Sequence, residues 1–235
     1  LYGAEQATMR LIEGLVAAGI SVRAILLHET RLGAGGSPLA EALRLCVPLT
    51  EIPVQGRFSR SVIGQIREIV ERDRIDVLHA PGYSEDWQAV LASKRGALFP
   101  VVSTVHGWLF RWDWKERLFQ ALNVAALRRF SRVIVLCGFY ERYLRRCGLG
   151  PLQIAQIPTG IRADAVVSRA EARRLWEAPG EIFTFGLLGR LSEEKDHALL
   201  LRAAVRLARD LETSPRSWRI LIAGDGPLRD KLRKM

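Results

Sequence analysis

The fold is indicated most directly by the stretch FGLLGRLSEEKDH, residues 185–197. An apolar run ends in a Gly-Arg pair, and a segment with a helical pattern begins a few residues later. This change from a strand pattern to a helical one is typical of a βα unit in a parallel sheet. It predicts that Arg190 leaves the carboxyl end of a strand and that Lys195 lies at the start of the following helix.

Outward from this stretch, short β-branched runs alternate with longer amphipathic segments along the whole chain. The alternation predicts an α/β fold with doubly wound parallel sheets. Two prolines restrict the second strand to an edge or a short piece, and the glycine-rich residues 31–38 are expected to form a loop. The expected strands are 21–27, 47–54, 76–80, 100–105, 132–136, 152–157, 182–188 and 218–223, and the expected helices are 4–18, 59–72, 86–94, 114–129, 139–147 and 194–211, with one more from Pro227.

Residues 158–180 differ from the rest because turn signals surround one short Arg/Glu-rich helix. We interpret this segment as a connection between domains. The sequence predicts an N-terminal domain over 1–165, a linker over 166–180 and the start of a C-terminal domain over 181–235. The second domain is expected to be incomplete, because two βα units are fewer than a doubly wound domain needs. The first strand of the N-terminal domain is expected to be missing as well.

The composition agrees with an ordinary globular protein, since 49% of the 235 residues are hydrophobic and 26% are charged. There is no apolar run of about 18 residues, so a transmembrane helix is not expected. The N-terminus has no secretory signal and no initiator Met, which suggests that the true start lies upstream. Three cysteines without a Cys-x-x-Cys spacing predict reduced thiols and a cytoplasmic location.

The formal net charge of +10 concerns the partners of the protein rather than its fold. It is compatible with nucleic acid, an anionic membrane surface or a phosphate-bearing substrate. The basic residues are spread along the chain, and no zinc finger or RNA-binding motif accompanies them. Nucleic acid is therefore the weakest of the three partners.

Ligands of open parallel sheets bind beyond the carboxyl ends of the strands, and several candidate residues are expected there. Arg190 and Lys195 could hold a diphosphate, because Arg offers a planar fork, Lys a mobile charge and a helix start favours anions. The alternative is a solvated Arg and a Lys that pairs with Glu193 or Glu194. Gly189 would let the backbone approach such a ligand.

Other strand ends carry weaker candidates. Gly224 and Gly226 flank Asp225 after the last strand, where they could lie against a nucleotide or simply form a tight βα turn. Gly3 opens the first helix, whose amides could face a phosphate. His106 ends the strand at 100–105, where it could bind a sugar hydroxyl or be structural; the same alternatives apply to His79, with the structural one favoured.

Taken in order, these segments resemble those of family-4 GT-B glycosyltransferases (glycosyl transferases group 1). The resemblance runs from Gly3 to the last helix and is most specific at IPTGI (157–161) and at 189–195. It implies two Rossmann-like domains that face a cleft. It also implies retaining transfer of a sugar from a nucleotide-diphosphate donor to a glycan or lipid-linked acceptor, in cell-surface polysaccharide or glycolipid synthesis. No obligatory metal or other cofactor is expected, in agreement with the absence of an Asp-x-Asp triplet.

The same resemblance implies roles for single residues. Arg190 and Lys195 would hold the donor diphosphate, and His106 would face the donor sugar near the reaction centre; these three are the predicted catalytic residues. The predicted donor-binding residues are Gly3, Gly189, Arg190, Lys195, Gly224 and Gly226.

Several features depart from the family pattern. Tyr2 replaces a glycine, Cys137 replaces a helix-capping serine, and the family's Glu-x7-Glu segment would lie beyond Met235. These departures leave open an inactive, truncated fragment that at most binds nucleotide or phosphate. The basic net charge leaves open a nucleic-acid-binding protein. The aromatic and cationic stretch from Trp108 to Phe119 could attach the protein peripherally to an anionic inner membrane leaflet, or could simply cover the helix beneath it.

Overall fold

The computed structural model describes residues 3–29, 37–54, 59–94, 96, 98–108, 114–160, 167–177, 182–211 and 217–235. The chain divides into two compact units, 1–161 and 162–235. Tyr2, the predicted loop at 31–36, residues 109–113 of the aromatic stretch and the predicted boundaries at 165 and 180 lie outside the described residues.

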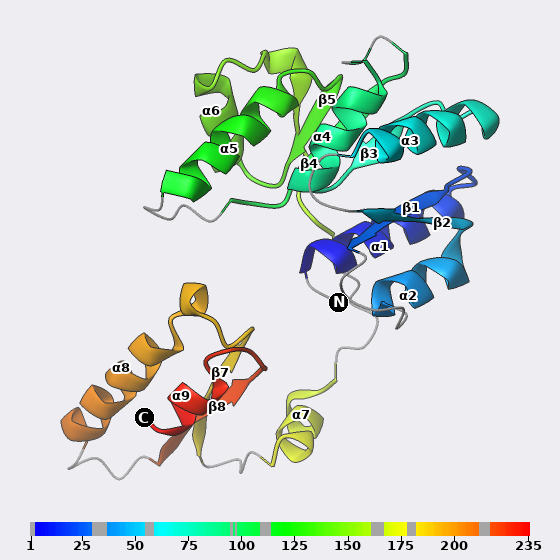
Figure 1. The fold of residues 1–235 in the computed structure, drawn as a ribbon. Helices are drawn as coiled ribbons and strands as arrows, with labels where there is room; N and C mark the ends of the chain where they lie inside the picture. The colour runs from blue at the N-terminus through cyan, green and yellow to red at the C-terminus, as the bar shows by residue number, and fades with distance from the viewer. Residues whose placement is uncertain are drawn as a thin grey trace. The chain divides into compact units, whose positions relative to one another are not determined.

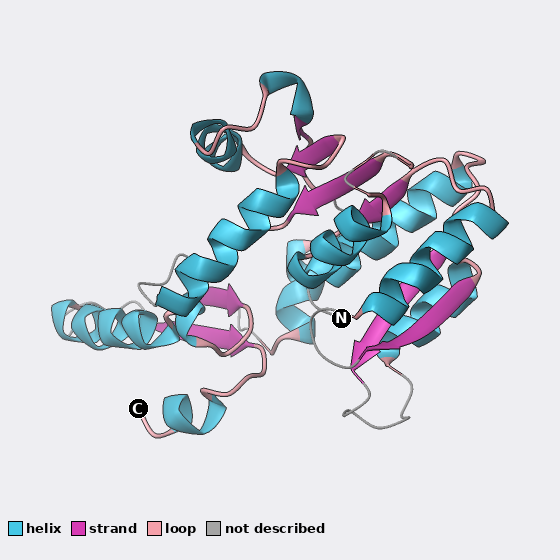
Figure 2. Ribbon diagram, turned by 45° about the horizontal axis from the view of Figure 1, so that its top comes forward, coloured by secondary structure: helices cyan, strands magenta, loops and turns pink. Residues whose placement is uncertain are grey.

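The first unit alternates helices with parallel strands (Figures 1 and 2). Strands β1 and β2 pair with each other, and β3, β4, β5 and β6 pair in that order. Both sheets are parallel throughout the described residues. The elements are α1 (Gly3–Ala17), β1 (Ala24–Glu29), α2 (Pro38–Cys46), β2 (Leu49–Val54), α3 (Arg60–Arg72), β3 (Leu78–Ala80), α4 (Tyr83–Ala92), β4 (Val101–Val105), α5 (Trp114–Leu127), β5 (Arg132–Val135), α6 (Gly138–Arg146), a 3₁₀ turn (Pro151–Gln153) and β6 (Ile154–Gln156).

The core of the first unit follows the apolar periodicity of its elements. Val101, Val133 and Val135 are fully buried on strands β4 and β5, and Leu127 and Leu144 cover them from α5 and α6. A smaller cluster joins α1 and α2 to the start of β1. This core holds the carboxyl ends of β3 and β4 in register, which is where the candidate residues lie.

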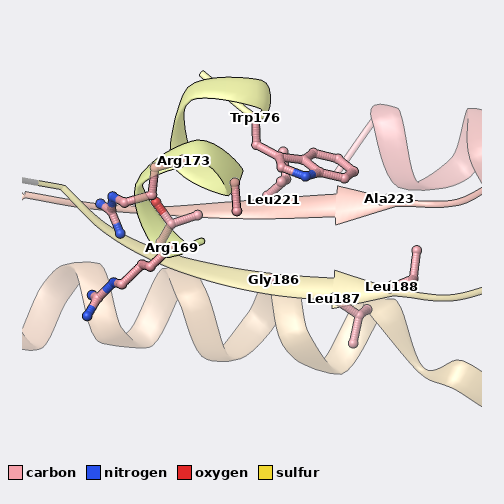
Figure 3. A pocket seen from close by; sticks show the side chains of 10 residues that line it. Arg169, Arg173, Trp176, Gly186, Leu187, Leu188, Leu221 and Ala223 are labelled. Atoms are coloured by element: carbon pink, nitrogen blue, oxygen red, sulfur yellow. The ribbon is translucent and has the colours of Figure 1, made fainter. Parts of the chain in front are cut away.

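The second unit is a parallel pair of strands with helices on opposite faces (Figure 3). Its elements are α7 (Arg169–Leu175), β7 (Phe183–Leu188), a 3₁₀ turn (Glu193–Lys195), α8 (His197–Asp210), β8 (Trp218–Ala223) and α9 (Arg229–Arg233). Helix α7, expected in the linker, is tied to this unit: Arg173 donates to the Ile182 carbonyl at 2.7 Å, and Arg219 donates to the Trp176 carbonyl at 3.1 Å.

Three elements differ from the sequence prediction. Helix α2 was missed, although Ser37 caps it through the Leu39 N–H and Pro38 occupies its first position. Strand β3 is limited to Leu78–Ala80, and Val77 before it is half exposed. The helix expected from 194 is broken at Asp196, whose backbone is left-handed, so that α8 begins at His197.

The other predicted helices and strands are confirmed to within a few residues at each end. Cys137 precedes α6 without a side-chain capping bond, as expected for a weak cap, and the three thiols are unpaired. Among the helices that the structure describes, none combines the length and apolar character needed to cross a bilayer.

Candidate functional site

Two histidines lie at the carboxyl ends of adjacent strands in the first unit. His79 on β3 is paired in register with Val102 on β4, and its Nε2 lies 2.8 Å from the hydroxyl of Thr104. Burial lowers the pKa of His79, and the positive charge of His106 lowers it further. The two imidazoles therefore share one end of the sheet, as the strand-end argument predicted.

His106 follows β4 directly and is half-buried. Burial lowers its pKa below the ordinary value near 6.5. At neutral pH the ring is therefore uncharged and can donate one hydrogen bond and accept another. Such a group can bind a sugar hydroxyl without adding a charge to the site.

The backbone after His106 is held tightly against helix α6. Gly107 has φ +137°, and a Cβ there would lie 2.9 Å from the hydroxyl oxygen of Tyr140. The N–H of Trp108 donates to that same oxygen at 3.2 Å. Trp108 itself is only 6% exposed and is part of the core, so for this residue the structure excludes the membrane-facing alternative.

Gly3, the remaining candidate of the first unit, opens helix α1 as predicted. No described atom comes within 4 Å of the position that a Cβ would take there. Sterically, the described surroundings would accept a larger residue at this position. The structure thus supplies the helix start, whereas the donor-loop role of Gly3 stays a prediction.

In the second unit, the loops after β7 and β8 are joined by backbone hydrogen bonds. The N–H of Gly189 donates to Ala223 at 3.0 Å, and that of Leu191 donates to the carbonyl of Asp225 at 2.9 Å. The N–H of Leu228 returns to the carbonyl of Leu191 at 3.0 Å. The two motifs that the sequence singled out are therefore parts of one hydrogen-bonded turn pair.

Both glycines of the second loop are required by this contact. A Cβ on Gly224 would overlap the carbonyl oxygen of Gly189. A Cβ on Gly226 would lie 2.5 Å from the carbonyl oxygen and 2.8 Å from the nitrogen of Leu191. Their closest neighbour is therefore protein backbone, which is a more specific reason for glycine than approach to a nucleotide.

The two predicted phosphate-binding cations lie close to one carboxylate. The pKa of Glu194 is lowered mainly by a hydrogen bond from the Ser192 hydroxyl, at 2.5 Å, and in part by the charges of Arg190 and Lys195. The methylene groups of Lys195 pass over Gly189, 3.8 Å from where a Cβ would be. Lys195 thus lies against Gly189, and the charges of Lys195 and Arg190 both reach the carboxylate of Glu194.

This cluster stands beside the start of α8. Asp196 caps the helix by accepting from the N–H of Leu199 at 3.1 Å. Lys195 is in the 3₁₀ turn before the helix, not in the helix itself as predicted. His197, to which the sequence gave no role, is 1% exposed, and neither ring nitrogen has a hydrogen-bond partner among the described residues.

A hollow of about 380 Å³ lies between α7 and the β7–β8 pair (Figure 3). Trp176 and apolar strand residues line much of it, and Arg169 and Arg173 lie toward its other end. None of the predicted site residues is among its lining residues. The predicted site residues therefore lie outside this hollow.

Residues 2–160 match the family described as Glycosyl transferase 4-like domain. No curated protein matches the sequence.

Solved structures with the same fold include HepE of Anabaena in complex with UDP and glucose (17% identity, TM-score 0.70), with 99% of this chain and 61% of that chain covered. They also include the lipopolysaccharide outer core galactosyltransferase WaaB in its apo form (12%, TM-score 0.65), with 100% of this chain and 60% of that one covered. A putative UDP-N-acetylglucosamine 2-epimerase from Listeria monocytogenes (14%, TM-score 0.55) is similar over 98% of this chain and 61% of that chain.

The chain thus spans about three fifths of the length of these solved structures. An epimerase among them means that the fold by itself does not fix the reaction. The match over residues 2–160 covers well over half of the chain and is independent of the loops at 189–195 and 224–226. The chain has a GT-B type α/β fold and belongs to the glycosyl transferase 4-like family.

Proposed function

We propose that the protein is part of a retaining glycosyltransferase that moves a sugar from a nucleoside-diphosphate donor to a hydroxyl group of a glycan or lipid-linked acceptor. The observation that carries this proposal is the joined turn pair of the second unit. In this turn pair Lys195 lies against Gly189 next to a helix start, and the charges of Lys195 and Arg190 both act on Glu194. Two cations at such a place suit a diphosphate better than a single phosphate.

In the proposed reaction, the bond between the sugar C1 and the diphosphate oxygen breaks, and a bond from C1 to the acceptor oxygen forms. The acceptor proton passes to the departing diphosphate, so that atoms and charges balance. Arg190 and Lys195 would stabilise the charge that develops on the diphosphate. His106, uncharged at neutral pH, would hydrogen-bond a hydroxyl of the transferred sugar. The proposed site uses no metal ion.

The complexes of HepE with UDP and with UDP and glucose support a nucleotide-sugar donor for this chain. WaaB, a lipopolysaccharide galactosyltransferase, supports a cell-surface glycan as the acceptor class. The nucleic-acid alternative gains no such support, because none of the similar structures named above is described as a nucleic-acid-binding protein.

The test is equilibrium binding of UDP, GDP and ADP and of the matching monophosphates to the full gene product at about 0.1 M salt. We expect one diphosphate to bind at least about 10-fold more tightly than its monophosphate, because an added charged hydrogen bond contributes about 1.5–3 kcal/mol. Transfer from the corresponding sugar nucleotide would then be followed by product analysis. Equal binding of mono- and diphosphates, or tighter binding of duplex DNA, would contradict the proposal.

We further propose a peripheral, cytoplasmic attachment to an anionic membrane through one face of α5. Trp114, Leu118 and Leu122 recur every four residues and are 68%, 50% and 41% exposed. The ammonium group of Lys115 lies 5.7 Å from the centre of the Trp114 ring. An exposed apolar stripe flanked by cations on a protein of net charge +10 suits the interface of an anionic bilayer.

For this attachment, we expect the protein to co-sediment with vesicles that contain phosphatidylglycerol and not with neutral phosphatidylcholine vesicles. The double change Trp114→Ser and Leu118→Ser should abolish co-sedimentation, whereas Leu45→Ser, at a residue that is 89% exposed on α2, should not. Absence of binding to anionic vesicles at low salt would contradict the proposed membrane attachment.

A further inference from the structure

A chain of buried polar side chains runs beneath the turn that carries His106. The indole N–H of Trp108 donates to the Oδ1 of Asn123 at 3.1 Å. The amide of Asn123 in turn donates to the Oδ2 of Asp86 at 2.7 Å. All three side chains are at most 6% exposed, and they come from the turn after β4, from α5 and from α4.

This chain fixes the direction of the Trp108 ring. The ring packs edge-on against Tyr140, with centroids 5.3 Å apart, and lies tilted against Tyr143, with centroids 5.5 Å apart. Its backbone N–H is held by the Tyr140 hydroxyl. Both ends of Trp108 are thus anchored, and His106 is only two residues away across Gly107.

Such a chain is a poor way to gain stability. Burial raises the pKa of Asp86 to about 7, and interactions with the side chains of Ser103 and Asn123 offset this only in part. Within the described residues, the Oδ1 of Asp86 and the Oγ of Ser103 are buried without a well-formed hydrogen bond. Apolar side chains of similar volume would usually stabilise a core at least as well. We therefore look to the geometric effect of these hydrogen bonds and not to their contribution to stability: they give the Trp108 ring one orientation.

We propose that Asp86, Asn123 and Trp108 are positioning residues, which hold the His106 turn in the orientation that glycosyl transfer requires. The inference rests on the proposed function, since it takes His106 as a residue that contacts the donor sugar. None of the three would touch the substrate, and each would act through the backbone of residues 106–108.

The test compares variants that remove hydrogen bonds between Asp86, Asn123 and Trp108 with a variant that restores them. Trp108→Phe keeps an aromatic ring but removes the indole donor, and Asn123→Leu keeps the approximate volume but removes both hydrogen bonds. In the double variant Asp86→Asn with Asn123→Asp, the new carboxylate can accept from Trp108 and from the amide at position 86. The matched control is Trp218→Phe on β8, whose indole N–H makes no hydrogen bond within the described part of the chain.

Full gene products are measured for folding, donor affinity and kcat. We expect both breaking variants to remain folded and to lose about 10- to 100-fold in kcat, because small misplacements of a site group have effects of that size. Donor affinity should change less than about 3-fold, which is less than 1 kcal/mol, and the double variant should recover most of kcat. Wild-type kcat in the folded breaking variants, or a double variant as impaired as Asn123→Leu, would overturn the proposal.

A second measurement tests the positioning role independently of whether the protein transfers a sugar. The pKa of the His106 ring is followed by NMR, with His79 as the neighbouring titrating group. If the turn loosens, the ring gains water and its pKa rises toward the ordinary value. We expect this rise in both breaking variants and its reversal in the double variant, even if the protein transfers no sugar. An unchanged pKa of His106 would refute the positioning role directly.

Discussion

Replacing Arg190 or Lys195 with Ala is expected to weaken binding of the nucleoside diphosphate about 10- to 100-fold each, since a hydrogen bond to a charged group contributes about 1.5–3 kcal/mol. The physical reason is the shared location of the two cations. Both act on the carboxylate of Glu194, and the Lys195 side chain passes over Gly189. A diphosphate at this turn would present several oxygens to the same pair.

The design of this experiment uses the difference between the two cations. Arg190→Lys keeps the charge and loses the planar fork, so it should fall between the wild type and Arg190→Ala. Arg206→Ala removes an exposed arginine from the middle of α8 and is the control for net charge. Affinity is measured by isothermal titration calorimetry at constant salt, because exposed charges are screened. Unchanged affinity in both alanine variants would defeat the diphosphate assignment.

Glu194 lies next to the proposed diphosphate site. Its carboxylate lies near Arg190 and Lys195, the two residues proposed to hold the diphosphate, and their charges favour its charged form. The charge of Lys195 is only a minor cause of this shift, so the alternative of a simple pair between Lys195 and a glutamate stays a prediction. Such a pair would not exclude diphosphate binding. A ligand with two or more negative charges attracts the two cations more strongly than one exposed carboxylate does.

Local sequence patterns predicted most helices and strands but few of the contacts and breaks that depend on residues distant in the sequence or on single backbone conformations. Strand β8 was predicted at Trp218–Ala223 and is observed there, because a β-branched apolar run is a local property. The break at Asp196 was missed, since a left-handed residue other than glycine leaves no periodic signal. Helix α2 was missed for a different reason: Ser37 and Pro38 were taken as the end of a glycine-rich loop, although the same pair is a helix start.

The candidate site shows the same division. His106, Arg190 and Lys195 could be selected because each stands at a strand end or helix start, which sequence patterns locate. Asn123 could not be selected, because its partner Asp86 is 37 positions away in the chain and neither belongs to a motif. The sequence also could not show why a glycine is needed at position 224, because the close contact is with the backbone of Gly189, 35 positions earlier.

Gly224→Ala is expected to destabilise the protein by about 3 kcal/mol, near the upper end of what overpacking costs. The new Cβ would overlap the carbonyl oxygen of Gly189, and backbone cannot move aside as a flexible side chain can. Gly226→Ala should behave alike, because its Cβ would meet the backbone of Leu191. Gly186→Ala, where no described atom lies within 4 Å of the added Cβ, is the matched control and should be nearly neutral.

Chemical denaturation followed by tryptophan fluorescence measures the loss of stability, and diphosphate titration of the folded variants measures its effect on binding. If the loop contact positions the cations, Gly224→Ala should lose donor affinity even under conditions where it remains folded. Wild-type stability in both Gly224→Ala and Gly226→Ala would mean that the two loops do not touch in solution. Lost stability with full diphosphate affinity would instead separate the turn pair from the phosphate site, and Arg190 and Lys195 would then bind without the support of the second loop.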